Sequence, residues 1–202
     1  MYLNSSKPFF LAGFVMLISA CASQPKVEMA QALSQPATAV VQPMAPNPAE
    51  LASYEAAVQA LDAGDVVAAK PVFESLSKKY PDFAGPLVNL AIVAEQEGDI
   101  DGAIAQYQVA LAIQPDHVAA LNNLAILLQT KGEFSRAAEF YKRGLSKSPD
   151  SPELNYNLAV LYELYLRDFE KAVKYYEVYS ASLSQPDADM EVLLKGLKRR
   201  IN

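Results

Sequence analysis

The sequence predicts an all-α chain in which pairs of helices stack one on another, and two observations support this prediction. The first is an internal repeat between Ala84 and Pro149, within which one unit occurs twice. The residues that recur, always at the same interval, are Asn89 and Asn123, Gly98 and Gly132, Ala103 and Ala137, Tyr107 and Tyr141, and Pro115 and Pro149. The second is the apolar spacing of three and four residues within each copy, which is typical of one face of a helix. A fixed period of roughly 34 residues indicates a repeat array rather than a single core.

Composition limits the classes of function. The chain has 202 residues, a formal net charge of −6 and no basic stripe, which argues against a nucleic-acid-binding protein. Its only cysteine is Cys21, so no disulfide can form within the chain.

Residues 1–20 have the pattern of a signal peptide. Lys7 supplies one positive charge, and an apolar run from Phe9 to Ile18 follows it. About ten apolar residues are too few to span a bilayer but suit a signal-peptide core. Small residues then precede Cys21.

The four residues Ile18-Ser19-Ala20-Cys21 resemble the lipobox of bacterial lipoproteins, although Leu is more usual than Ile at its first position. The resemblance implies that Cys21 is lipidated with a diacylglyceryl group and an amide-linked acyl chain, and becomes the mature N-terminus. Residue 22 is Ala and not the Asp that commonly retains such proteins in the inner membrane, which implies the periplasmic face of the outer membrane. A plain secretory signal with an incidental cysteine is the alternative.

Residues 21–49 are expected to form the lipidated cysteine and a disordered tether. The segment is rich in Ala, Gln and Pro and shows no apolar periodicity. Proline removes a backbone donor and fixes φ, so neither helix nor sheet propagates through such a segment.

Residues 50–183 are expected to form the repeat domain, with units at about 50–83, 84–117, 118–151 and 152–185. In the second unit a helix is predicted from about Ala84 to Glu97, Gly98 is expected to end it, and Asp99 to cap the next helix. Pro71 falls early in the second helix of the first unit, where proline is tolerated only in the first turn. Leu90 and Leu124 are expected in the core.

The fourth unit departs from the period. It has no glycine at the turn, and Ala172 and Tyr176 arrive one residue late, which predicts one inserted residue at the turn. Residues 186–202 are expected to form a C-terminal capping helix with an apolar stripe and a basic end. A basic helix that contacts anionic lipid is the alternative for this segment.

These units resemble the tetratricopeptide repeat (TPR) family, which has a small residue at unit position 8, Gly at 15, Ala at 20, an aromatic at 24 and Pro at 32. The resemblance covers about residues 50–183 and implies a TPR superhelix, an α-solenoid of about four repeats. It also implies a concave groove lined by unit positions 5, 9 and 12 of the first helices. Those positions are Tyr54, Val58, Leu61, Val88, Ile92, Glu95, Asn122, Ile126, Gln129, Tyr156, Val160 and Glu163.

The ninth position is Val58, Ile92, Ile126 and Val160 in the four units. A row of branched apolar residues suits an amphipathic helix or an apolar peptide strip, although some of these side chains could instead pack against neighbouring repeats. The Lys and Asn that clamp a carboxylate in some chaperone-binding TPRs are absent from positions 5 and 9.

No catalytic, cofactor or metal site is expected. His117 is the only histidine, and no second histidine is available to share a metal with it. No Gly-rich phosphate loop or nucleophile elbow occurs.

The expected function is therefore an outer-membrane-anchored lipoprotein that acts as a scaffold or assembly factor for another envelope protein. TPR lipoproteins of the pilotin type, which help pilus or secretion machinery assemble, are slightly favoured over adaptors for peptidoglycan hydrolases. An enzyme subunit or a ligand-binding receptor is the alternative of another class. The tyrosine-rich fourth unit leaves a homo-oligomer open.

Overall fold

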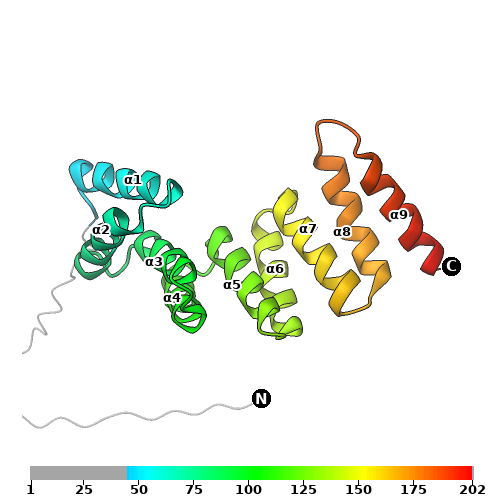
Figure 1. Ribbon diagram of the computed structural model, residues 1–202, viewed down its shortest axis with the longest axis horizontal. Coiled ribbons are helices and arrows are strands. Elements are labelled where there is room, and N and C mark those ends of the chain that lie inside the picture. The colour runs from blue at the N-terminus through cyan, green and yellow to red at the C-terminus, as the bar shows by residue number, and fades with distance from the viewer. Residues whose placement is uncertain (1–44, 202) are drawn as a thin grey trace, which may run out of the picture. The chain divides into compact units, whose positions relative to one another are not determined.

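The computed structural model describes residues 45–201, so the signal peptide, Cys21 and residues 22–44 of the expected tether lie outside the described residues. Every regular element within residues 45–201 is helical (Figure 1). The α-helices and the one π-helical turn are α1 (Pro48–Asp62), α2 (Val66–Lys79), α3 (Ala84–Gln96), α4 (Ile100–Ile113), α5 (Val118–Thr130), α6 (Phe134–Lys147), α7 (Pro152–Val160), η1 (Leu161–Tyr165), α8 (Phe169–Ser182) and α9 (Ala188–Ile201).

The helices pack in the order of the chain. Within each pair the first helix lies against the second, as α3 does against α4, and the second then contacts the first helix of the next pair (Figure 1). The last helix, α9, packs on α8. The predicted all-α solenoid of four helix pairs with a C-terminal capping helix is confirmed.

Small residues at fixed unit positions let the two helices of a pair approach closely. The second helices place an alanine at the contact, and all four alanines are fully buried: Ala69, Ala103, Ala137 and Ala172, each 0% exposed. One turn further along lie the aromatic residues that fill the space towards the next pair: Phe73, Tyr107, Tyr141 and Tyr176, each at most 2% exposed. The sequence prediction for both positions is confirmed.

The turns inside the first three pairs share one geometry. Gly64, Gly98 and Gly132 have φ values of 82°, 81° and 78°, a region that glycine enters without steric cost. In the second pair the amide of Asp99 donates to the carbonyl of Ala94, five residues earlier, at 2.8 Å, and the amide of Gly98 donates to the carbonyl of Glu95 at 3.0 Å. These are the two hydrogen bonds of a Schellman motif. Asp99 also caps α4 as predicted, because its side chain accepts from the amide of Gly102 at 2.9 Å.

The fourth pair accommodates its extra residue differently from the prediction. The residue is not added to the turn; it is absorbed by the π-helical turn η1 at the end of the first helix, where the amide of Leu166 donates to the carbonyl of Leu161 at 3.0 Å. Arg167 then occupies the left-handed conformation, with φ 56°. It stands one residue beyond the period of the three turn glycines, so a residue with a Cβ adopts the backbone that glycine adopts elsewhere.

The expectation that Pro71 lies in the first turn of its helix was wrong. Pro71 is the sixth residue of α2, beyond the first turn, and it provides no amide hydrogen for the carbonyl of Val67. Val67 is 86% exposed and Pro71 is also exposed, so water can reach this side of the helix.

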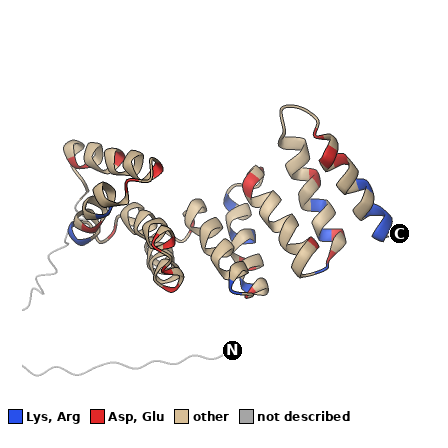
Figure 2. Cartoon of the chain, viewed as in Figure 1, with Lys and Arg blue, Asp and Glu red and all other residues tan. Residues whose placement is uncertain are grey.

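The C-terminal helix α9 matches the capping interpretation. Met190 and Leu197 are buried, and Lys198 pairs with Glu177 of α8 at 2.6 Å. Acidic residues lie in its first turn and basic residues in its last, as Figure 2 shows, which is the favourable arrangement for a helix dipole. None of the helices between residues 45 and 201 has the length and apolarity needed to cross a membrane.

Candidate functional site

The ninth-position row consists of Val58, Ile92, Ile126 and Val160. The first helices α1, α3, α5 and α7 each supply one of these side chains, at the same place in successive units. Ile126 is 38% exposed, and the other three are half-buried. All four therefore keep part of their apolar surface accessible.

The fifth-position residues are not equivalent to one another. Val88 and Asn122 are buried and leave little side-chain surface for a partner. Tyr54 is half-buried, packs against Phe73 and accepts a hydrogen bond from the side-chain amide of Asn89 at 2.8 Å. Tyr156, by contrast, is 41% exposed.

Three of the twelfth-position residues bind the aromatic residue of their own unit. The donors are tyrosine hydroxyls of the second helices. Tyr107 donates to Glu95 at 2.5 Å, Tyr141 donates to Gln129 at 3.5 Å, and Tyr176 donates to Glu163 at 2.8 Å. Leu61, in the first unit, pairs instead with the apolar core around Phe73 and is buried. These side chains hold the two helices of a unit together.

Burial changes the acidity of the Glu95–Tyr107 pair. It raises the pKa of the Glu95 carboxyl group above its usual value, against the smaller opposing effect of the hydrogen bond from Tyr107. Burial, followed by the hydrogen bond to Glu95, likewise raises the pKa of Tyr107. An aspartate or glutamate with a raised pKa can serve as a general acid. Burial accounts for the raised pKa of Glu95, however, and its carboxylate accepts the hydrogen bond from Tyr107 that holds α3 to α4.

Sequence reasoning missed the role of the sixth position. Its asparagines reach back to the preceding unit: Asn89 donates to Tyr54, Asn123 to the hydroxyl of Tyr107 at 3.0 Å, and Asn157 to the side-chain oxygen of Asn122 at 3.1 Å. The signal was present in the sequence, because an asparagine recurs at this position in three successive units. Each of these bonds joins successive units through one buried and one half-buried side chain.

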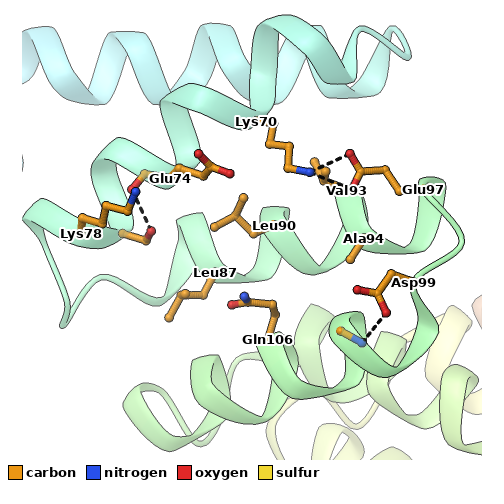
Figure 3. A pocket seen from close by; sticks show the side chains of 12 residues that line it. Lys70, Glu74, Lys78, Leu87, Leu90, Val93, Ala94, Glu97, Asp99 and Gln106 are labelled. Carbon is orange, nitrogen blue, oxygen red and sulfur yellow. Dashed lines mark hydrogen bonds and ion pairs between the residues drawn. The ribbon is translucent and has the colours of Figure 1, made fainter.

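Sequence reasoning also missed a hollow between α2, α3 and α4. It has a volume of about 400 Å³, and Figure 3 shows Leu87 and Leu90 of α3 lying between side chains of the two flanking second helices. Leu90, expected in the core, is only half-buried because it lines this hollow, whereas Leu124 is 0% exposed.

His117 has a structural place. It is the N-cap of α5, and its Nδ1 accepts a hydrogen bond from the amide of Ala120 at 3.3 Å. Within residues 45–201 no group of three or more His, Cys, Asp or Glu side chains is arranged to hold a metal ion. Cys21, the predicted lipidation site, lies outside the described residues.

Stacked helix pairs that recur at a fixed interval along the chain define the class of helical-repeat solenoids. Two sequence profiles described as tetratricopeptide repeat match residues 60–125 and 94–155, and residues 152–177. The chain belongs to the tetratricopeptide-repeat family, and proteins of this family generally bind other proteins.

Several solved structures share the fold. A tetratricopeptide repeat protein of Parabacteroides merdae is 21% identical with a TM-score of 0.62, over 76% of this chain and 62% of that one, so this chain spans less than two thirds of its length. MamA of Desulfovibrio magneticus is 15% identical with a TM-score of 0.63, over 77% of this chain and 87% of that one. A thermophilic tetratricopeptide repeat protein of Thermus thermophilus is 20% identical with a TM-score of 0.59, over 74% and 81%. No curated protein matches the chain.

Proposed function

We propose that this chain is an outer-membrane-anchored tetratricopeptide-repeat lipoprotein that acts as a scaffold or assembly factor for another envelope protein. The partner contributes an amphipathic helix or an apolar strip that lies along the ninth-position row. Lipid on Cys21 anchors the chain at the periplasmic face, and no catalytic step is involved.

The observation that supports this proposal is the accessibility of the ninth-position row. Ile126 is 38% exposed, and Val58, Ile92 and Val160 keep part of their surface free. Apolar side chains that recur along one face of a solenoid provide the anchors that helix-in-groove recognition needs. Burial of all four inside the solenoid would have argued against this mode.

The test of the binding surface is crosslinking in intact cells from a photoreactive residue at position 156, because Tyr156 is a 41% exposed fifth-position residue of the same predicted groove. The double variant I92D/I126D should lose the crosslinked partner while its far-ultraviolet circular dichroism stays that of the parent. A matched control is V109D, because Val109 of α4 is 50% exposed and lies outside the row. Loss of helicity in I92D/I126D, or an unchanged crosslink, would refute a docking role.

The identity of the crosslinked protein decides the pathway. We favour a component of pilus or secretion machinery; a peptidoglycan hydrolase would instead support the adaptor alternative. The anchor has a separate test: C21A should move the protein from the membrane fraction to the soluble periplasmic fraction. A C21A protein that still sediments with membranes would refute lipidation as the anchor.

A further inference from the structure

The outward face of the last helix, α9, has no part in the proposed function. Met190 and Leu197 are buried and hold α9 to α8. Val192, Lys195 and Arg199 lie about 160–220° from Leu197 around the helix axis, on the opposite side. All three are exposed, Val192 to 72%. These three side chains form the outward face of α9, which is apolar at its start and cationic towards its end.

Two arginines beside this face contact one aromatic ring. Arg167, in the turn before α8, and Arg200, in the last turn of α9, place their Cζ atoms 5.2 Å and 4.8 Å from the centroid of the Phe169 ring. The ring attracts each guanidinium group, but the two positive charges repel each other. An anion that accepts hydrogen bonds from the guanidinium groups would offset this repulsion.

The chain neutralises the cations at this end only in part. Lys198 pairs with Glu177 of α8 at 2.6 Å. Among residues 45–201 no ion pair involves the four other cations of α9 and the turn before α8, which are Arg167, Lys195, Arg199 and Arg200. This end of the solenoid therefore presents positive charge, although the whole chain has a net charge of −6.

Open hollows lie on both sides of α9, and apolar side chains adjoin the cations in each. One has a volume of about 400 Å³ and is lined by Glu191, Leu194, Lys195, Lys198 and Arg199. The other has a volume of about 420 Å³ and is lined by Glu163, Leu193, Gly196, Leu197, Arg199 and Arg200. Each contains one glutamate, and the Glu163 carboxylate accepts a hydrogen bond from the hydroxyl of Tyr176. Leucine surface beside Lys and Arg suits a ligand that is both anionic and apolar.

We propose that α9 and the turn before α8 bind the surface of a bilayer that contains anionic phospholipid. The phosphate groups pair with the guanidinium and ammonium groups, and Val192 inserts at the level of the headgroups. Charge complementarity favours this occupant, because the cations lack acidic partners and lie beside apolar surface. The contact is compatible with the capping role of α9, since the side that packs on α8 is the opposite one.

The contact is weak by itself. A Lys or Arg near an anionic bilayer strengthens binding about fivefold, so the four cations contribute about 10²–10³-fold together. That is less than one acyl chain provides, and one acyl chain holds a protein only marginally. The use of this contact in the cell therefore rests on the proposed lipid anchor, which would raise the effective concentration of membrane around α9. Because α1 is the first helix in the packing order and α9 the last, the contact would hold the far end of the solenoid at the membrane as well.

The probe is a vesicle of phosphatidylethanolamine with about a quarter phosphatidylglycerol and a small share of lipid that carries a nitroxide on its headgroup. In the control vesicle phosphatidylcholine replaces phosphatidylglycerol. The protein is the full chain as C21A/V192C with a fluorophore at position 192. The matched control is C21A/V67C, because Val67 of α2 is 86% exposed and far from α9 in the packing order. Residues 1–20 are present in every variant, so their effect is common to all.

The anionic vesicles should quench the fluorophore at position 192 in a saturable way, and quench the one at position 67 much less. K195Q/R199Q should lower the ratio of bound to unbound label at position 192 about 25-fold, at about fivefold for each cation. K78Q/K142Q removes the same charge from exposed lysines of α2 and α6 and should leave the ratio unchanged. Far-ultraviolet circular dichroism checks that every variant keeps its helices.

Equal quenching by the control vesicles, equal quenching at position 67, or an unchanged ratio in K195Q/R199Q would overturn the proposal. A response at position 192 to inorganic phosphate alone would indicate a site for the free ion, and a response to protein concentration without vesicles would indicate a second copy of the chain. Either result would overturn it too. Since C21A carries no lipid, a failure here leaves the anchor at Cys21 standing, and a failure of the fractionation test leaves this contact measurable.

Discussion

Leu90 and Leu124 form a matched pair for a stability measurement, since each holds the same position in successive units. Leu124 is 0% exposed, and Leu121 and Leu128, on either side of it along α5, are buried as well. Leu90 is half-buried and lines the hollow. We expect L124A to lower the free energy of unfolding much more than L90A does.

The magnitudes follow from what each truncation exposes. Removing the three outer carbons of a buried leucine costs about 2–2.5 kcal/mol of transfer free energy, at about 0.8 kcal/mol for each carbon. The void left at Leu124 adds a cavity contribution, which brings the total to about 3–5 kcal/mol. At Leu90 water already reaches the side chain and no closed void results, so about half the transfer term remains, or about 1 kcal/mol.

The assay is urea unfolding followed by far-ultraviolet circular dichroism for the parent and both variants. Repeat arrays can lose cooperativity, so the comparison is valid only if the denaturant slopes of the three proteins agree. Equal losses in the two variants would show that the hollow is closed in solution.

Three further predictions concern single side chains, each measured by urea unfolding. R167G should raise the free energy of unfolding by about 0.5–1 kcal/mol, because glycine adopts the left-handed backbone without steric cost; a loss would mean that the contact between Arg167 and the ring of Phe169 matters more. The pKa of Glu95 is raised in the folded state, so the ionised carboxylate destabilises the folded state at neutral pH. E95Q should therefore stabilise the chain at neutral pH, and this gain should shrink as the pH falls towards 4.5, because the carboxyl group of the parent then becomes protonated. For Glu50 the pKa is lowered from 4.5 to about 2, chiefly by the hydrogen bond from Lys79, so its stabilisation should be present above pH 4.5 and be lost as the pH falls towards 2. E50Q should remove that acid dependence, and an unchanged acid profile would contradict the assignment.

The period predicts several features that depend on a residue's own unit. The left-handed turn at Gly98 and the close helix contact at Ala103 follow from residue type and spacing alone, and both are present. The tie between Glu95 and Tyr107 could also have been found, since an acid or amide precedes a tyrosine by the same interval in successive units.

Features that depend on a neighbouring unit could not be predicted in this way. The period treats Leu90 and Leu124 as equivalent, although the side chains around them differ. Lys70, Ser77, Ala94 and Gln106 line the hollow, and the residues one unit later are Ile104, Leu111, Leu128 and Phe140. The accessibility of the candidate site varies for the same reason: Asn122 is buried because its side chain bonds to Glu153 and Asn157 of the next unit. Arg167 shows another limit, since the sequence revealed an extra residue but not that a helix would widen to hold it.

The sixth-position asparagines have a consequence for how such an array changes length during evolution. Each amide contacts whatever the previous unit offers, a tyrosine hydroxyl for Asn89 and Asn123 or an amide oxygen for Asn157. Deleting residues 84–117 would bring Asn123 to the place of Asn89, where the hydroxyl of Tyr54 would meet an identical group. A gene that lost or duplicated this segment would thus encode a protein in which the newly adjacent units can form the same asparagine–tyrosine hydrogen bond.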